Sequence, residues 1–406
     1  MCKKIIILIT IVSMFAIIHC NDNTKSGLLK DQHGKYIRPI PEPDKSITNQ
    51  IEIKRETYLL NNSGILNISG WFRIPLVIYN EQNIKANKQR IKKWEHYTFY
   101  NKNFCGGITI SDIATVGMGS IELFDIKNHK QITNVTLMVR PETIQFPVNT
   151  YDTLEFKKGK SFVIIKKINN QRITQFYFDN KDKENIISGT LTFTQHGREA
   201  LAIITPFNEP KLFFYEYKVP SLSVKGTITI GNKYYNFSDE TTFGVLDWGR
   251  GAWPSINQWL WAAGGGLIKG KLFSFNLGYG FGNNHKATEN GIVYNGIVHK
   301  LNKVVWHYDI KDYMKPWVFT SNDKRFEMTL KPVYLLHSDI TLKEMVNFLK
   351  QLYEIFSFKE IMEIISTKAY LNKVFGYYSG YVILDDGSKV IIDNMLGFAE
   401  VMYQEW

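Results

Sequence analysis

The sequence predicts an all-β protein made of two β domains, the second of which contains a helical hairpin. Aromatic residues make up 14% of the chain, a high share that favours strands because aromatic rings suit the pleated surface of a sheet. Short alternating runs such as "KSFVIIKKI" and "IISGTLTFTQHG" are separated by Gly, Asn and Asp at even spacing, which is typical of barrels and sandwiches. A chain of 406 residues suits two domains better than one.

Residues 1–20 have the pattern of a signal peptide. The basic start "MCKK" is followed by an apolar run from Ile5 to Ile18, which is shorter than the roughly 20 residues of a membrane-spanning helix. The run leads into Cys20 and resembles a bacterial lipoprotein signal, in which the cysteine becomes lipidated, although His19 stands where a small residue is usual. We therefore expect a protein of the bacterial cell envelope, lipid-anchored to a membrane, whose mature chain has no transmembrane helix. The alternative is simple cleavage, which gives a secreted or periplasmic protein.

The remaining chain divides into a tether and two β domains. Residues 21–50 are polar and proline-punctuated, as expected of a tether and entry segment. We place the N-terminal β domain at 51–205 and the C-terminal one at 206–406. The dipeptides Gly231-Asn232 and Asp386-Gly387 predict hairpin turns. One weakly amphipathic helix is predicted in "EQNIKANKQRIKKWEHY", residues 81–97.

The helical hairpin is predicted at residues 340–373 of the C-terminal domain. Thr341 with Glu344 and Ser357 with Glu360 have the spacing of capping boxes, and apolar residues follow at helical spacing. One interpretation is a helix pair packed on the outside of a barrel. The other is a lid or a membrane-facing paddle, because both helices also carry lysines.

Composition excludes several functional classes. The formal net charge is +11, but the 38 acidic residues are interspersed with the basic ones, so no nucleic-acid partner is expected. A mild attraction to anionic membrane surfaces explains the positive net charge at least as well as nucleic-acid binding would. Cys105 is expected to be a buried packing residue. No zinc motif, P-loop or nucleophile elbow is present, and the histidines are not spaced as metal ligands, so we expect neither a metal nor a cofactor.

The stretch "LDWGRGAWPSINQWLWAAGGG", residues 246–266, is the main candidate for a functional site. If its first part is a strand, Asp247 faces one way while Trp248 and Arg250 face the other. We expect Asp247 to face a pocket and Arg250 to stabilise the end of a barrel. A guanidinium close to indoles suits cation–π contacts, in a site or in a core. Asp247 is the candidate catalytic residue, and the candidate ligand-binding residues are Trp248, Arg250, Trp253, Trp259, Trp261 and Glu289.

Several motifs together resemble a known family. "FGVLDWGRGAWPSINQWLWAAGGG", "FNLGYGF", "SGWFRIPLVIYN" and the closing "GFAEVMYQEW" resemble an uncharacterised bacterial family, the domain of unknown function numbered two thousand eight hundred and four, over about residues 60–406. That family is distantly similar to the superfamily of carotenoid hydratases, tocopherol cyclases and AttH-like proteins. The resemblance implies two tandem lipocalin-like β-barrels. It also implies protonation of a carbon–carbon double bond, which needs a carboxylic acid kept neutral by apolar surroundings.

These observations leave three functional hypotheses. The leading one is an exported, membrane-tethered protein that binds a hydrophobic or lipid-like ligand in a β-barrel. The second is an acid-catalysed hydratase, cyclase or isomerase of an isoprenoid-like substrate, with Asp247 as proton donor. The third is a structural envelope protein whose tryptophans only build a core.

Overall fold

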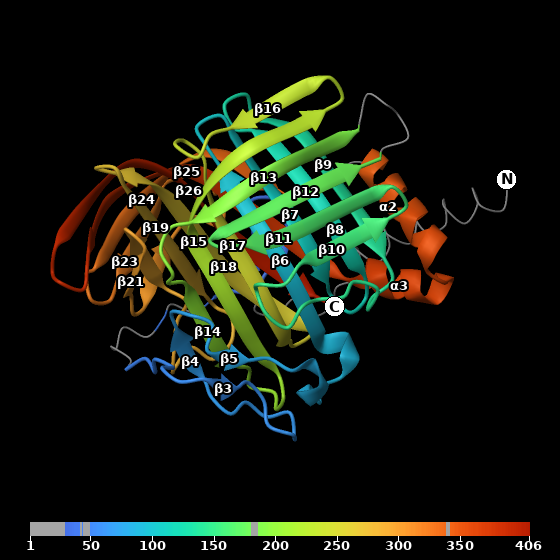
Figure 1. Ribbon diagram of the computed structural model, residues 1–406, viewed down its shortest axis with the longest axis horizontal. Helices are drawn as coiled ribbons and strands as arrows, with labels where there is room; N and C mark the ends of the chain where they lie inside the picture. The colour runs from blue at the N-terminus through green and yellow to red at the C-terminus, as the bar shows by residue number, and fades with distance from the viewer. Residues whose placement is uncertain (1–28, 41–42, 44–48, 180–185, 338–341) are drawn as a thin grey trace.

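The computed structural model describes residues 29–40, 43, 49–179, 186–337 and 342–406. The predicted signal peptide at 1–20, the lipidation of Cys20 and much of the tether lie outside these residues. The described chain is built mainly from antiparallel strands in two large curled sheets, so the all-β prediction is confirmed (Figure 1).

The first large sheet is 13-stranded, and its main path runs β10-β11-β12-β13-β15-β17-β6-β7-β8-β9. β14 pairs with β15 and β4, and β16 pairs with β15. The two edge strands of the path, β9 and β10, are consecutive in the chain, which draws the edges together and curls the sheet into a barrel. The strands are β4 (Gly70–Phe72), β6 (Ile91–Tyr100), β7 (Phe104–Asp112), β8 (Gly117–Asp125), β9 (Lys130–Val139), β10 (Leu154–Lys158), β11 (Ser161–Ile168), β12 (Gln171–Phe178), β13 (Ile187–Gln195), β14 (Leu201–Pro206), β15 (Phe213–Ile230), β16 (Lys233–Phe237) and β17 (Phe243–Ala252).

The second large sheet is nine-stranded, in the order β21-β20-β19-β18-β26-β25-β24-β23-β22. Its edge strands are again consecutive, and the four Cα steps from Lys300 to Val304 span at most about 14 Å, so this sheet also curls into a barrel. Two minor sheets pair β1 (Leu29–Lys30) with β2 (Tyr36–Ile37), and β3 (Thr57–Tyr58) with β5 (Val77–Ile78). The strands of the second barrel are β18 (Ile256–Ile268), β19 (Lys271–Tyr279), β20 (Gly291–Tyr294), β21 (Ile297–Lys300), β22 (Val304–His307), β23 (Trp317–Ser321), β24 (Phe326–His337), β25 (Lys368–Ile383) and β26 (Lys389–Glu405).

The boundary between the barrels lies later in the chain than the sequence predicted. β15 and β17 belong to the first sheet and β18 opens the second, so the division falls between Ala252 and Ile256 rather than at residues 205 and 206. The predicted turn Gly231-Asn232 does join two strands, because Ile230 of β15 pairs with Lys233 of β16. The second predicted turn, Asp386-Gly387, lies in the connection between β25 and β26.

Both barrel interiors are filled with apolar side chains. Phe99, Phe193 and Trp248 belong to the core of the first barrel, and Phe275 and Tyr378 belong to the core of the second. Because side chains alternate along a strand, every core residue is flanked by neighbours on the opposite, outer face. The outer faces of the two barrels pack against each other, where residues of both barrels such as Val245 and Phe398 form one buried apolar cluster.

Helices α2 (Leu342–Ile355) and α3 (Phe358–Ser366) lie between β24 and β25, which pair directly. They pack on the outside of the first barrel (Figure 1), where Leu352 and Ile361 belong to the same apolar cluster as Val116 and Met138. The prediction of a helix pair on the outside of a barrel is confirmed, although the barrel is the first one. The Ser357–Glu360 capping box is present, whereas Thr341 lies outside the described residues. Residues from 368 onward in the predicted hairpin belong to β25.

The prediction of a helix at residues 81–97 is wrong. Two short 3₁₀ turns, η1 (Glu81–Asn83) and η2 (Lys88–Arg90), lead directly into β6. β6 pairs with β17 on one side and β7 on the other, and these ladders outweigh a weak helical propensity. Within the described residues, the structure contains no helix with the length and hydropathy needed to span a membrane.

Candidate functional site

A cavity of about 340 Å³ lies between the barrels, where their outer faces meet. One wall is formed mainly by β6, β8, β15 and β17, and the other by β18, β25 and β26. Its aromatic lining includes Trp94, Phe214, Trp253, Trp259, Trp261 and Phe281. Two sets of ionisable residues also line it. We call Glu216, Lys218, Asp247 and Glu289 the Glu216 set, and Glu122, Lys373, Glu400 and His96 the Glu122 set.

Strand alternation explains how charged groups reach this cavity from otherwise apolar strands. On β15, Glu216 and Lys218 face the cavity, while Tyr215 and Tyr217 belong to the barrel core. The same alternation on β17 directs Asp247 into the cavity. Glu216, Lys218 and Asp247 are therefore held on rigid, hydrogen-bonded strands, so the sheet fixes their positions.

Asp247 is held as a carboxylate by its neighbours. Its Oδ2 lies 2.8 Å from the Lys218 ammonium, and its Oδ1 accepts a 2.8 Å hydrogen bond from Trp94 Nε1. Burial raises the pKa of Asp247, but Lys218 and the hydrogen bonds to this carboxylate outweigh burial and leave the pKa below its usual value. Asp247 is therefore ionised at neutral pH.

Glu216 has the opposite electrostatic character. Burial raises its pKa well above the usual value, and the nearby carboxyls of Glu289 and Asp247 add to this effect although Lys218 opposes it. Within the described residues, Oε2 of Glu216 has no hydrogen-bond partner as a carboxylate. Both Asp247 and Glu289 lie within hydrogen-bonding reach of Glu216, and such carboxyl–carboxyl contacts require a proton. Burial and the neighbouring carboxyls therefore favour the protonated form of Glu216, against the opposing effect of the Lys218 ammonium that contacts it.

Glu289 completes the Glu216 set from the second barrel. Asn276 Nδ2 donates a 3.1 Å hydrogen bond to its Oε2, and burial raises its pKa. A Cβ on Gly278 would lie 2.0 Å from the carboxyl carbon of Glu289. Gly278 belongs to the motif "NLGYGF", so a glycine of this motif makes room for a cavity carboxyl.

The Glu122 set meets the Glu216 set at Trp261. The ammonium groups of Lys218 and Lys373 lie 3.9 Å and 4.9 Å from the centre of the Trp261 ring. Lys373 also forms a 3.4 Å ion pair with Glu400, whose Oε1 accepts a hydrogen bond from Trp259 Nε1. Two buried lysines are therefore balanced by carboxylates against an aromatic surface.

His96 is a neutral member of the Glu122 set. Its Nδ1 lies 2.7 Å from Thr109 Oγ1 and its Nε2 lies 2.8 Å from Thr98 Oγ1, so both ring nitrogens are engaged. Burial, with a contribution from the Lys373 cation, lowers the pKa of His96 to about 3. It orients its neighbours and does not exchange protons near neutral pH.

The cavity brings together Asp247, Glu289 and three of the predicted tryptophans, Trp253, Trp259 and Trp261. Trp248 and Arg250 do not line it, because they face the interior of the first barrel.

Arg250 donates to the Trp94 and Pro147 carbonyls and lies 4.1 Å from the centre of the Trp248 ring. These contacts hold the Arg250 side chain inside the first barrel, where it is fully buried. Burial lowers its pKa to about 10.

Sequence reasoning missed Glu216, Lys218, Glu122, Lys373 and Glu400. A usable signal was present in "FFYEYKV", where Glu216 and Lys218 occupy alternate positions of a strongly apolar strand. Among the described residues, no group of His, Cys, Asp and Glu is arranged to hold a metal ion. In the Glu216 set, the Lys218 ammonium contacts the carboxyls of both Glu216 and Asp247.

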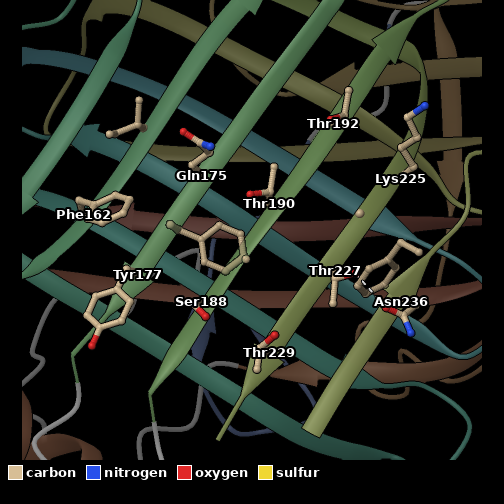
Figure 2. Close-up of a pocket in the computed structure, with 15 residues that line it drawn as sticks. Phe162, Gln175, Tyr177, Ser188, Thr190, Thr192, Lys225, Thr227, Thr229 and Asn236 are labelled. Carbon is tan, nitrogen blue, oxygen red and sulfur yellow. Dashed lines mark hydrogen bonds between the residues drawn. The ribbon is translucent and has the colours of Figure 1, made fainter. Parts of the chain in front are cut away.

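A larger depression of about 1030 Å³ lies on the outer face of β11, β12, β13, β15 and β16 (Figure 2). Figure 2 shows Thr190 and Thr192 of β13 beside Thr227 and Thr229 of β15 on an open sheet surface. None of the predicted site residues lines this depression. This depression is open, whereas the cavity between the barrels gathers ionisable residues with shifted pKa values, so that cavity is the better candidate for chemistry.

Comparison with known proteins identifies the family. The family described as "Domain of unknown function (DUF2804)" matches residues 50–359 and 355–406. A search of curated proteins found no match. Among solved structures, the chain is similar to kievitone hydratase from Nectria haematococca, at 11% identity and a TM-score of 0.47, over 89% of this chain and 98% of that one. It is also similar to a candidate AttH protein from Nitrosomonas europaea, at 12% identity and a TM-score of 0.44, over 82% of this chain and 98% of that one.

The family match covers most of the sequence, from residue 50 to residue 406. The chain belongs to the DUF2804 family.

Proposed function

We propose that the cavity between the barrels binds a compact hydrophobic molecule and that Glu216 donates a proton to it. The hydrophobic ligand follows from the aromatic walls, which bury apolar surface on both sides. The proton transfer follows from the ionisable groups among those walls. This function combines the two leading hypotheses from the sequence, with the ligand between the barrels rather than inside one.

The observation that carries the proposal is the state of Glu216. The residue is 2% exposed, its pKa is raised well above the usual value by burial, and it lies beside the ionised Asp247 at the edge of a tryptophan-lined space. A carboxylic acid kept neutral at pH 7 is the group needed to protonate a weak base such as an alkene carbon. In this assignment Glu216, rather than Asp247, is the donor.

The neighbouring residues have distinct roles in such a step. When Glu216 gives up its proton, Lys218 stabilises the carboxylate that remains. Asp247 and the indole faces of Trp259 and Trp261 stabilise the positive charge that develops on the ligand. Trp94 holds Asp247 in place through its indole N–H. The reaction class is hydration, cyclisation or isomerisation, each of which begins with protonation of a double bond.

The volume of the cavity limits the size of the ligand. Ligand pockets usually measure about 300–1,000 Å³, and a cavity of about 340 Å³ lies at the lower end of this range. A monocyclic terpene or a compound of similar size suits it better than a long polyene. Affinity should therefore fall along the series limonene, farnesol, retinol.

The first test measures binding and proton transfer with defined probes. Binding of limonene, α-terpineol, farnesol and retinol is followed by quenching of tryptophan fluorescence. The protein is then incubated with limonene or α-terpineol in D₂O, and deuterium in the recovered compound is measured by mass spectrometry. We expect the smaller probes to bind more tightly and to acquire deuterium.

The matched variant is Glu216→Gln, which keeps the shape of the side chain and removes the acid. It should still quench fluorescence, while deuterium incorporation falls on the order of 100-fold or more. The proposal is contradicted if none of the four probes binds, if retinol binds best, or if Glu216→Gln exchanges deuterium as fast as the natural protein.

We also propose that the protein is exported and attached to the outside of a bacterial membrane through a lipid on Cys20. The supporting observation is the sequence pattern of the first twenty residues. Membrane association of Cys20→Ser is compared with the natural chain by fractionation of cells, with Cys105→Ser as the control. We expect only Cys20→Ser to leave the membrane fraction. Equal membrane association of all three proteins contradicts the anchor.

A further inference from the structure

The Glu122 carboxyl is the part of the cavity that the proposed proton donation leaves unused. It lines the cavity from β8, on the wall contributed by the first barrel. Within the described residues it makes neither a hydrogen bond nor an ion pair, unlike Glu216, Asp247, Glu289 and Glu400, each of which has a polar partner. A carboxyl held in an aromatic cavity without a protein partner has its oxygens available to a bound molecule.

The local backbone is shaped to admit this carboxyl. Gly107 of β7 pairs with Glu122 of β8, and a Cβ on Gly107 would lie 2.7 Å from Glu122 Oε1 and 3.0 Å from His96 Cε1. Any larger residue at 107 would therefore displace the carboxyl. The glycine and the engaged ring of His96 together fix where the Glu122 oxygens lie.

The charges around Glu122 suit a group that accepts a proton. Burial raises its pKa, Lys373 lowers it and Glu400 raises it again. Burial makes the carboxylate more basic than an exposed one, while the Lys373 ammonium limits that effect. The other titratable groups near it are His96, which is neutral, and the buried Cys105 thiol, whose pKa is raised by burial. Tyr334 also lies close enough for its pKa to be raised in part by Glu122.

We propose that Glu122 is a second proton-transferring residue of the cavity, which accepts a proton after Glu216 has donated one. This inference rests on the proposed function. The two carboxyls belong to the two ionisable sets that meet at Trp261, so one molecule that fills the cavity reaches both. Glu216 is the acid and Glu122 is the base.

The proposed proton transfers need no reactant other than the ligand and water. The Glu216 O–H bond breaks and a C–H bond forms from the π electrons of the ligand, which leaves a cation. Glu122 then takes a proton from a neighbouring carbon, whose C–H electrons form the shifted double bond. In the alternative outcome Glu122 takes a proton from water, whose oxygen bonds to the cation. Solvent returns the proton to Glu216 and removes it from Glu122.

Limonene oxide can test whether Glu122 and Glu216 act on the same bound molecule, and the natural substrate need not be known. The Glu122 carboxylate attacks a ring carbon of the epoxide, the C–O bond breaks, and the epoxide oxygen takes the proton of Glu216. The product is a hydroxy-ester on Glu122, and Glu216 becomes a carboxylate. Peptide mass spectrometry of the full-length protein locates the ester directly, so the result does not depend on a variant folding.

We expect an ester on Glu122 in the natural protein, and labelling slower on the order of 100-fold in Glu216→Gln, because the epoxide then lacks its acid. Gly107→Ala should also slow the labelling by displacing the carboxyl. Glu142→Gln removes an exposed glutamate and should leave the labelling rate unchanged.

An ester on Asp247, Glu289 or Glu400 instead of Glu122 would overturn the inference, as would the absence of any ester. An ester on Glu122 that forms equally fast in Glu216→Gln would also overturn it. The two proposals fail separately. A protein that exchanges deuterium into limonene but acquires no ester on Glu122 retains the proposed function and refutes only the role of Glu122.

Discussion

Lys218 is the residue whose removal should affect stability most clearly. It is 3% exposed, and its ammonium is shared by Glu216 and Asp247. In Lys218→Met, Glu216 can stay neutral, but Asp247 is left as a buried charge without a cation. Breaking a buried ion pair by removing one partner costs roughly 3–5 kcal/mol. We expect a loss of about 3 kcal/mol in the free energy of unfolding at pH 8, because the hydrogen bond from Trp94 remains.

The loss should depend on pH in a defined direction. In the natural protein the pKa of Asp247 is lowered, so its contribution is present above the pKa of the unfolded chain and is lost on acidification. In Lys218→Met burial acts without the cation and raises this pKa above the unfolded value. The variant then loses stability as pH rises through that window, by up to about 1.4 kcal/mol per pH unit. The deficit should therefore be smaller at pH 5 than at pH 8.

Urea unfolding followed by tryptophan fluorescence at pH 5 and pH 8 measures these differences. The controls are Asp247→Asn and the double variant Lys218→Met/Asp247→Asn, which together with the single variants form a double-mutant cycle. The double variant should recover much of the loss, because no unpaired charge remains. A loss below about 1 kcal/mol at pH 8, or a double variant no more stable than Lys218→Met, would refute the reasoning.

Two further predictions concern packing. Gly249→Ala places a Cβ 1.9 Å from the Trp94 ring, so it should displace the ring and break its hydrogen bond to Asp247, lowering stability by about 1–3 kcal/mol in thermal unfolding. Gly266→Ala meets only Met395, at 3.7 Å, and is the control that should change nothing. Leu352→Ala removes a fully buried side chain of α2 at a cost of about 2–5 kcal/mol. Limited proteolysis should then cleave within the hairpin, and cleavage confined to other segments would contradict its docking role.

The sequence was sufficient for the features that depend on local pattern. Alternating apolar runs predicted the strands, and Ser357 with Glu360 predicted the start of α3, because both signals arise within a few residues. The prediction of a helix at 81–97 failed because it also rested on local pattern alone. Pairing of this segment with β17 and β7 overrides its weak helical pattern. Local pattern cannot report which strands will pair.

The site was predicted only where one stretch of chain carries it. Asp247, Trp259 and Trp261 drew attention because they are close in sequence. Lys373 and Glu122 come from distant strands, and only the docking of two barrels brings them to the same cavity. The raised pKa of Glu216 could not be predicted either, because it depends on burial and on the carboxyls of Asp247 and Glu289.

The site is divided between the barrels. In the Glu216 set, the first barrel supplies Lys218 and Asp247 and the second supplies Glu289. In the Glu122 set, the first barrel supplies Glu122 and the second supplies Lys373. A gene fragment that encodes one barrel would therefore yield only part of each ionisable set, even if that part folded well. Recombination between relatives would have to exchange residues on both sides of the junction together, so the two halves of this gene are expected to be inherited as one unit.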